Sequence, residues 1–364
     1  MVQIIHSSIN IRLTWLAVIC LFTTIPVFAG QSVVKTTDDS FYVKFLDADG
    51  IAIKAGEVVS DRAMCEAKAR IDRMLKHIPA VRKNLAGIGA ELHIIGKDQK
   101  TSDLPEYRYL KGKPFDGSLT IDERTRGLGG LFTSCGEENL LKIPNDRYFG
   151  RDILVHEFAH NLYNNGIPAS VKKQFEARFS DATAGGLWVK SYAATNPNEF
   201  FAELSMWYFG THGDLGMTGQ PPDNGAEGLR QYDKDSFRLF DDLYMGRVPN
   251  LDLARESLKP IPVAMESQTR SMSGTQSARV LLVNTTSHDL RKYWIDYGGK
   301  RVDYGRLLKY STDTFETYST HAWLLTDESD RPVLLFTAVP GDCWIKITET
   351  DAGTLPMKPA ELTQ

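Results

Sequence analysis

The sequence predicts an α+β domain followed by a small all-β module. Up to about residue 257, segments with the apolar spacing of helices alternate with short strands. After residue 277, only short β-type runs follow. The stretch between them, Leu258 to Ser277, is rich in Pro and Ser and has the composition of a linker. A chain of 364 residues also favours two domains over one or three.

The composition is that of a globular protein. Hydrophobic residues make up 42% of the chain and charged residues 24%, which excludes the disordered, collagen-like and coiled-coil classes. A total of 42 Lys and Arg against 46 Asp and Glu gives a net charge of −4. The chain therefore lacks the excess of positive charge that would predict a nucleic-acid partner.

Residues 1–29 have the layout of a secretory signal. One charged residue, Arg12, precedes an apolar run from Leu13 to Ile25, and Ala29 offers a small residue for cleavage. The run is shorter than the ~20 residues that cross a bilayer. We expect a secreted protein, extracellular or periplasmic, without stable membrane insertion after cleavage. An uncleaved anchor and an N-terminal core strand are the alternatives.

Three cysteines remain beyond the signal, and an oxidising compartment permits a disulfide between two of them. Cys65 and Cys135 fall in the same predicted domain, whereas Cys343 lies in a strand-like stretch far along the chain. The expected pair is therefore Cys65–Cys135, and three buried free thiols are the alternative.

The first domain, expected over residues 30–257, contains four helical segments and two strand regions. Ser60 is a plausible N-cap for the first helix, with Asp61 in the first turn. The helices are expected at Ser60 to Leu85, Asp152 to Asn164, Asn196 to Phe209 and Tyr232 to Met245, and the strands at Ala90 to Gly96 and within Leu128 to Leu141.

The second domain is expected over residues 278–350, before a tail at 351–364. Turn signals such as Gly298-Gly299 separate its β-type runs, which predicts a small sandwich or barrel. The runs are Arg279 to Asn284, Leu290 to Tyr297, Phe315 to Tyr318, His321 to Thr326, Pro332 to Thr337 and Cys343 to Thr348.

The run His156-Glu157-Phe158-Ala159-His160 lies inside a predicted helix. Positions i and i+4 share one helix face, so both imidazoles can reach one ion, with Glu157 beside them at a water on that ion. Zinc is the metal this pattern favours, one ion per chain. Two surface histidines beside an acid are the alternative.

A third ligand is available in the next predicted helix. Asn196 is an N-cap and Pro197 sits at the first helical position, which places Glu199 at the third. Glu203 lies one turn on, and two carboxylates on an apolar helix need a cation or strong donors. Two His and Glu199 leave a fourth position for water, the arrangement of catalytic zinc. Glu203 would orient a His ligand. The alternative is a capping box formed by Glu199.

These residues, with Ser191-Tyr192 upstream, resemble the anthrax lethal factor and Pro-Pro endopeptidase group of zinc metalloproteases. The resemblance implies a zincin-like fold in which His156, His160 and Glu199 bind zinc. It also implies that Glu157 is the base and that the Tyr192 hydroxyl stabilises the transition state. In zincins an edge strand commonly holds the substrate backbone, and the candidate is Gly127, Leu128, Gly129 and Gly130, whose glycines would let a peptide approach.

The second domain resembles the β-domain of the von Hippel–Lindau tumour suppressor, a β-sandwich that holds a hydroxyproline-containing peptide. An alignment without gaps from Trp294 to Trp323 places five residues at its pocket positions, with Thr in place of Ser. These residues are Trp294, Tyr304, Thr317, His321 and Trp323. Aromatic walls would accept the pyrrolidine ring, while a hydroxyl and an imidazole bind its 4-hydroxyl. The alternative is that the aromatic residues are sandwich core.

The sequence thus predicts a secreted zinc-dependent endopeptidase that hydrolyses peptide bonds through a zinc-activated water, with a peptide-binding β-domain appended. The expected substrates are extracellular proteins rich in proline and hydroxyproline. Two alternatives stay open. One is an adhesin that binds hydroxyproline or proline peptides and carries a vestigial protease domain, and the other is a zinc amidase acting on cell-wall peptides.

Overall fold

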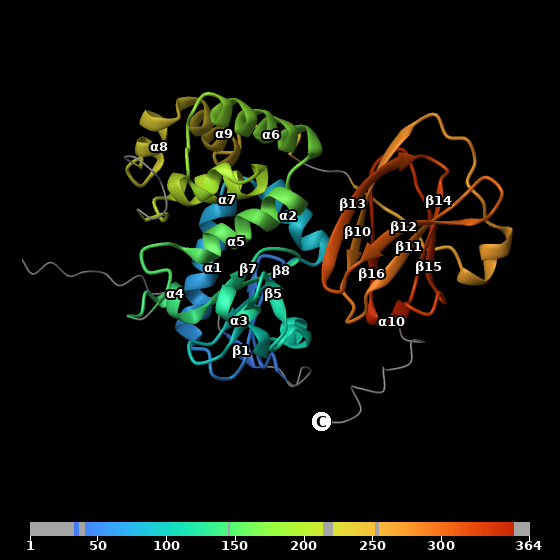
Figure 1. Cartoon of the computed structure of the whole chain (residues 1–364), viewed down its shortest axis with the longest axis horizontal. Coiled ribbons are helices and arrows are strands. Elements are labelled where there is room, and N and C mark those ends of the chain that lie inside the picture. The colour runs from blue at the N-terminus through green and yellow to red at the C-terminus, as the bar shows by residue number, and fades with distance from the viewer. Residues whose placement is uncertain (1–32, 36–40, 145, 214–220, 252–254, 353–364) are drawn as a thin grey trace, which may run out of the picture. The chain divides into compact units, whose positions relative to one another are not determined.

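The structure is a computed structural model that describes residues 33–35, 41–144, 146–213, 221–251 and 255–352 (Figure 1). The predicted signal at 1–29 and most of the predicted tail lie outside the described residues. Within them, no helix has both the length and the apolar character that crossing a membrane requires.

The N-terminal region is built on a mixed six-stranded sheet in the order β1-β2-β3-β4-β8-β7. Strands β3, β4 and β8 are parallel, and the remaining pairs are antiparallel. The strands are β1 (Val34–Lys35), β2 (Lys44–Ala48), β3 (Ile51–Ala55), β4 (Glu91–Ile95), β7 (Gly127–Leu128) and β8 (Phe132–Gly136). A separate hairpin joins β5 (Pro114–Asp116) to β6 (Leu119–Thr120). The short β7 is the edge strand.

Nine helices accompany these strands among the described residues of this region. They are α1 (Asp61–Leu75), α2 (Pro79–Ile88), α3 (Ile121–Arg124), α4 (Glu137–Leu141), α5 (Ile153–Asn161), α6 (Ala169–Ala184), α7 (Pro197–Phe209), α8 (Ala226–Tyr232) and α9 (Lys234–Tyr244). Short 3-10 turns occur at Thr101–Asp103, Pro105–Leu110 and Tyr192–Ala194, and a π-helical turn at Leu162–Gly166 continues α5.

Local signals explain where the helices begin and end. The Ser60 side chain caps α1 by accepting from the Ala63 N–H, as predicted. The prediction of a single helix from Ser60 to Leu85 is wrong, because the helix is interrupted before Pro79, which starts α2. The sequence also missed α6, whose buried residues are few: Val171, Phe175 and Ala182.

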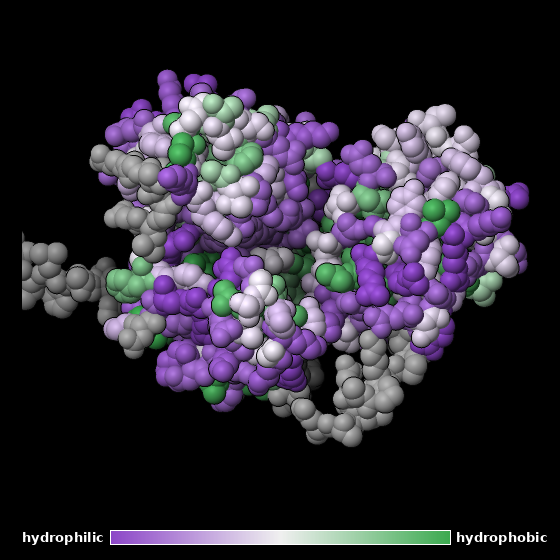
Figure 2. Space-filling model, viewed as in Figure 1, coloured by the Kyte–Doolittle hydropathy of each residue, from purple (hydrophilic) through white to green (hydrophobic). Residues whose placement is uncertain are grey.

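Helix α5 contacts β7, β8 and α7, so it lies between the sheet edge and the helical layer (Figure 1). Leu154, Phe158 and Leu162 are fully buried in the core and form an apolar stripe. The opposite side of α5 faces a cavity. Apolar side chains are mostly inside, and the face shown in Figure 2 is largely hydrophilic with small scattered apolar groups.

The C-terminal region consists of two four-stranded sheets, β13-β10-β16-β9 and β12-β11-β14-β15. The strands are β9 (Glu256–Ser257), β10 (Ser277–Asn284), β11 (Leu290–Ile295), β12 (Arg301–Leu307), β13 (Ser311–Tyr318), β14 (Ala322–Thr326), β15 (Pro332–Thr337) and β16 (Gly341–Ile347). A short helix α10 (Glu349–Ala352) follows. Side chains from both sheets, such as Leu282 and Phe336, form one core. The predicted sandwich is correct, although the sequence missed β12.

The segment predicted as a linker, Leu258 to Ser277, is part of this sandwich. Leu258 is buried in its core, Ile261 bridges to Leu335, and the Ser271 hydroxyl donates to the backbone of β11 at 2.5 Å. A 3-10 turn at Val263–Gln268 adds to it. The Pro-rich composition indicated the absence of a long helix, but it carried no information about contacts.

The predicted Cys65–Cys135 disulfide is not formed, because Cys65, Cys135 and Cys343 are all free thiols. Cys135 is fully buried in β8. Cys65 is only partly buried and lies one position beyond the buried Met64 in α1. Membership of the same domain was therefore too weak a criterion for pairing these thiols.

Candidate functional site

The two histidines of α5 meet at the wall of a cavity. Asp152 caps the helix by accepting from the Val155 N–H, and this sets the register of the following turn. One turn later, the Nε2 atoms of His156 and His160 lie 3.1 Å apart. Both side chains are more than nine-tenths buried. The predicted i, i+4 pair therefore converges on one point.

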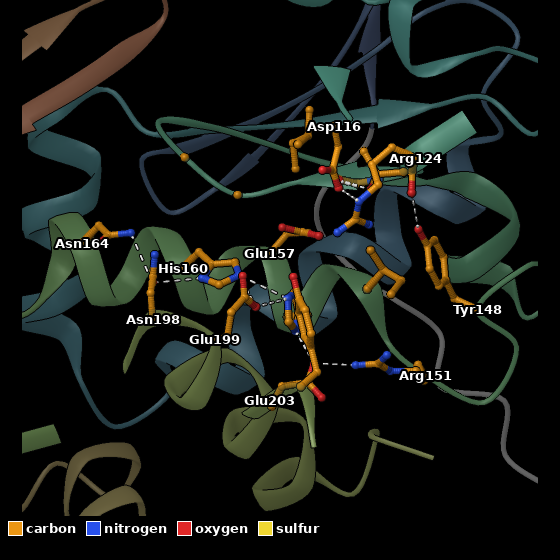
Figure 3. Close-up of a pocket in the computed structure, with 18 of the residues that line it drawn as sticks. Asp116, Arg124, Tyr148, Arg151, Glu157, His160, Asn164, Asn198, Glu199 and Glu203 are labelled. Carbon is orange, nitrogen blue, oxygen red and sulfur yellow. Dashed lines mark hydrogen bonds and ion pairs between the residues drawn. The ribbon is translucent and has the colours of Figure 1, made fainter. Parts of the chain in front are cut away.

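Helix α7 brings Glu199 to the same point. The Asn196 side chain accepts from the Asn198 and Glu199 N–H groups at 2.9 Å, which begins α7 immediately before the carboxylate. Glu199 Oε2 then lies 3.3 Å from His156 Nε2 and 3.4 Å from His160 Nε2 (Figure 3). Ligands on a tetrahedral zinc ion with bonds of ~2.0–2.2 Å are about 3.3–3.6 Å apart. The triangle of 3.1–3.4 Å therefore fits a metal.

Two carboxylates compete for the third ligand position. Glu157 lies with both histidines in a group whose ligand atoms are within 4.8 Å of one another. However, Glu199 Oε2 is nearly equidistant from the two Nε2 atoms and is buried without a hydrogen-bond partner. A buried carboxylate oxygen without a donor fits a cation. Glu157 instead accepts a hydrogen bond from the Gly129 backbone. By this geometry Glu199 is the better candidate for a third ligand.

The remaining nitrogen of each histidine faces a polar group. His156 Nδ1 lies 3.0 Å from Glu203 Oε1, and His160 Nδ1 lies 3.0 Å from Asn198 Oδ1. These partners leave both Nε2 atoms for the ion. Glu203 thus lies close enough to His156 for the orienting role, which stays a prediction.

Glu203 is itself held on both sides. Arg151 donates to its Oε1 at 2.5 Å, and His212 Nε2 lies 2.7 Å from its Oε2. The sequence did not identify Asn198, Arg151 or His212. Asn198 directly precedes the candidate ligand Glu199 and could have been found from that neighbourhood, whereas no local signal marks Arg151 or His212.

The electrostatics of the cluster indicate a place for positive charge. Burial by itself would lower the pKa of His156, but Glu199 and Glu203 outweigh burial and raise this pKa to about 10. Burial would raise the pKa of Glu199, yet the two histidines bring it down to about 2. The carboxylates thus favour a proton on His156, which a metal ion would replace.

Glu157 has the environment of a general base. Burial raises its pKa above the usual value, while the charges of His156 and His160 oppose this shift. A carboxylate with a raised pKa accepts a proton more readily near neutral pH. Glu157 also lines the cavity beside the two histidines.

Tyr192 begins a short 3-10 turn and lines the same cavity. Its ring is stacked on the ring of His156, with a distance of 6.4 Å between their centroids, and its side chain is 43% exposed. The cavity has a volume of about 750 Å³, and all five predicted catalytic and metal-binding residues line it. The hydroxyl therefore has access to a ligand in the cavity.

The predicted substrate strand forms another wall of the cavity. Gly127, Leu128, Gly129 and Gly130 all line it, and Gly127 and Leu128 form the edge strand β7. The reason for two of the glycines differs from the expectation. A Cβ on Gly127 would lie 2.6 Å from Ile153 and 3.2 Å from Glu157, and a Cβ on Gly129 would lie 2.6 Å from His160. The missing side chains at Gly127 and Gly129 therefore let this segment approach α5. They do not serve to admit a peptide.

The five predicted pocket residues of the C-terminal region also lie close together. Thr317 Oγ1 is 3.0 Å from His321 Nδ1, and the Trp294 ring is 5.3 Å from the His321 ring. Tyr304 packs edge-on against Trp323 at 5.0 Å. Strands β11 and β14 place Trp294 directly opposite Trp323.

Other side chains complete this group. The Tyr297 hydroxyl lies 3.3 Å from His321 Nε2, and Phe315 contacts Trp323 at 4.4 Å. The sequence did not single out either residue. The indole N–H groups of Trp294 and Trp323 are buried without a partner. Burial lowers the pKa of His321, which favours the neutral form of its imidazole.

Comparison with known proteins identifies part of the chain. Residues 269–338 match the family model described as the VHL beta domain. This range contains all five predicted pocket residues and most of the two sheets. The C-terminal region is therefore a VHL-like β-domain, a type that suggests peptide binding. A search of the curated proteins found no match to the chain.

Proposed function

We propose that this chain is a secreted zinc-dependent endopeptidase with a zincin-like catalytic domain and a peptide-binding β-domain. The observation that carries the proposal is the triangle of His156 Nε2, His160 Nε2 and Glu199 Oε2, with sides of 3.1–3.4 Å. Two His and one Glu leave one position of a tetrahedral zinc ion open, as catalytic sites require. When bound, zinc would polarise the scissile carbonyl and make water more acidic.

The chain's own residues supply the proton transfers. Glu157, whose pKa burial raises, accepts the proton of the attacking water and passes it to the leaving amine. Tyr192 donates its hydroxyl hydrogen to the carbonyl oxygen as negative charge develops there. Glu203 and Asn198 hold the imidazoles of His156 and His160 in the orientation that the metal needs.

The walls of the cavity suit an extended peptide. The edge strand β7 pairs with β8 along one side, and no described strand pairs with its other side. It borders the cavity that Glu157 lines. An edge strand offers backbone N–H and C=O groups to a substrate that pairs with it. This arrangement favours a protein or peptide substrate.

For the β-domain, we propose a hydroxyproline-containing ligand. A neutral His321 and the Thr317 hydroxyl, 3.0 Å apart, can both bond a 4-hydroxyl inserted beside them. Trp294 and Tyr304 would contact the ring, while Trp323, which is buried in the sandwich core, packs against Tyr304. Together, the two sites favour extracellular substrates rich in proline and hydroxyproline.

Cleavage of a peptide library with mass-spectrometric readout tests the proposal. The zinc-loaded full chain should cut internal peptide bonds, and Glu157→Gln should not. Cleavage of peptidoglycan peptides alone would favour the amidase. Absence of cleavage together with hydroxyproline binding would favour the adhesin.

A further inference from the structure

A chain of three hydrogen bonds leads from the candidate ligand His160 to a lysine on another helix. His160 Nδ1 lies 3.0 Å from Asn198 Oδ1 on α7, and Asn164 Nδ2 donates to the same oxygen at 3.4 Å (Figure 3). Asn164 Oδ1 in turn accepts from Lys172 Nζ of α6 at 3.2 Å. Neither Asn164 nor Lys172 takes part in the proposed reaction.

Asn164 continues the row of side chains that α5 presents to the cavity. It lies four residues after His160, as His160 lies four residues after His156, and it belongs to the π-helical turn Leu162–Gly166 that continues the helix. All three side chains line the cavity, and Asn164 is partly buried. Its amide therefore lies beside the proposed metal site without being a candidate ligand.

The lysine determines the direction of the hydrogen bonds in this chain. An ammonium group has three donors and no acceptor, so the Asn164 amide must turn its oxygen toward Lys172. The N–H₂ group of Asn164 then faces Asn198, whose oxygen accepts from it. Lys172 Nζ also lies 4.5 Å from the centroid of the Tyr163 ring, a position that suits the charged form of the lysine.

The orientation of the Asn198 amide selects the tautomer of His160. When the amide oxygen faces Nδ1, that nitrogen carries the proton, and the lone pair on Nε2 is available for a metal ion. A reversed amide would present its N–H₂ group to Nδ1, which would place the proton on Nε2, the ligand atom. The N–H₂ group of Asn164 disfavours this reversal, because two donors would then face each other.

We propose that Lys172 and Asn164 are positioning residues that fix the Asn198 amide and thereby the metal-binding tautomer of His160. The inference rests on the proposed function, because it takes His160 as a zinc ligand. Its consequences differ in sign from those of simple electrostatics. Coulomb attraction makes a zinc ion bind more tightly near an added negative charge or a removed positive charge, whereas the tautomer of His160 depends only on donors and acceptors.

The dissociation constant of zinc from the full chain, measured by competition with a chelator, tests the role of Asn164. Asn164→Asp keeps the shape of the side chain but replaces the donor with an acceptor. The Asn198 amide should then reverse, and zinc binding should weaken by roughly 10-fold, although the added charge alone would strengthen it. Asn164→Ala removes the donor without adding an acceptor, so zinc binding should weaken by only about 3-fold.

Two further variants test the rest of the chain. Lys172→Met should weaken zinc binding by about 3-fold, although it removes a positive charge. The neighbouring Lys173 is exposed on the same helix, so Lys173→Met is the matched control and should leave the affinity unchanged. Asn198→Asp should remove the dependence on Asn164, because a carboxylate accepts through either oxygen. Asn164→Ala should therefore have no effect when it is combined with Asn198→Asp.

Each contrary result has a distinct meaning. Unchanged or tighter zinc binding in Asn164→Asp would overturn the inference, as would equal losses from Asn164→Ala in wild type and in Asn198→Asp. A lower unfolding temperature of zinc-free Asn164→Asp would assign its loss to the fold and overturn the inference as well. These results leave the proposed function standing, whereas a wild-type chain that takes up no zinc would overturn the proposed function itself.

Discussion

Two histidine sites in this chain place the same side chain in opposite environments. His156 lies between two carboxylates, which raise its pKa to about 10 against the effect of burial. His321 lies among a threonine hydroxyl, a tyrosine hydroxyl and aromatic rings, and burial lowers its pKa. The environment of His156 favours a positive charge, and that of His321 favours a neutral hydrogen-bonding partner.

This difference shows that the groups around an imidazole determine which ligands the imidazole can bind. Carboxylates at 3.0 and 3.3 Å from His156 stabilise a proton or a metal ion. Hydroxyl groups at 3.0 and 3.3 Å from His321 stabilise neither, but they can exchange hydrogen bonds with a ligand hydroxyl. One chain therefore combines a site suited to a cation with a site suited to a neutral hydrogen-bonding ligand.

The largest expected effect is the loss of the metal. His160→Ala and Glu199→Ala should each reduce zinc from about one ion per chain to near zero and abolish peptide cleavage, because a three-ligand site lacks a substitute ligand. Elemental analysis by mass spectrometry measures this directly. The exposed His77→Ala serves as the matched control and should retain zinc. Full zinc and activity in Glu199→Ala would contradict the ligand assignment.

Removal of the base should separate chemistry from metal binding. Glu157→Gln keeps the shape of the side chain but cannot accept a proton, so cleavage should fall by roughly 10²–10⁴-fold. Zinc content and unfolding temperature should stay at the wild-type values. Steady-state kinetics on one peptide measures the loss, and activity within a few-fold of wild type would argue against Glu157 as the base.

A third histidine, His93, extends the comparison, because it too lies between carboxylates but does not line the cavity. His93 Nδ1 lies 2.5 Å from Glu106 Oε1, and its Nε2 lies 2.9 Å from Glu91 Oε2. Burial would lower its pKa, but Glu106 and then Glu91 raise it to about 9. The charged form is thus favoured by folding, by up to ~3 kcal/mol relative to an unfolded pKa of ~6.5.

The sign of the pH effect follows from this raised pKa. The stabilisation by His93 should be complete below pH ~6.5 and should disappear as the pH rises through about 9. Urea unfolding from pH 6 to 9.5, with excess zinc so that His156 does not titrate, should show this loss in wild type and not in His93→Gln. Equal pH slopes in the two proteins would contradict it.

The smallest effect concerns recognition by the β-domain. Full-length protein should bind a hydroxyproline peptide more tightly than its proline twin by ~1–3 kcal/mol, the cost of leaving buried polar groups unpaired. His321→Ala should remove most of this difference without affecting cleavage of short peptides. Isothermal calorimetry provides the measurement, with His288→Ala as the control. Equal affinity for both peptides in wild type would end the hydroxyproline proposal.

Local rules explain which predictions about the elements succeeded. The caps at Ser60 and Asn196 lie where the sequence predicted them, because a cap depends on residues within one turn. The spacing of His156 and His160 works in the same way. The alternation of the β-type runs correctly indicated two packed sheets.

Predictions that required a distant partner were less successful. The proposed linker is packed through Leu258 and Ser271, and the proposed Cys65–Cys135 bond is absent. Both were inferred from composition or shared domain membership, which say nothing about which atoms meet. For the same reason the sequence did not identify Asn198 and His212. Asn198 lies beside His160, and His212 lies beside Glu203, so each contacts a side chain from another turn or loop.

The sequence by itself determined the helix that carries His156, Glu157 and His160, the capped start of the helix that carries Glu199, and the β-rich character of the last third. Periodicity and capping are interactions over one turn, so they are written in neighbouring residues. Only the tertiary structure decided that Glu199 meets both imidazoles at 3.3–3.4 Å and that β7 lies at the sheet edge beside them. Those distances depend on how α5 and α7 pack in a close-packed core, where contacts join residues far apart in the chain.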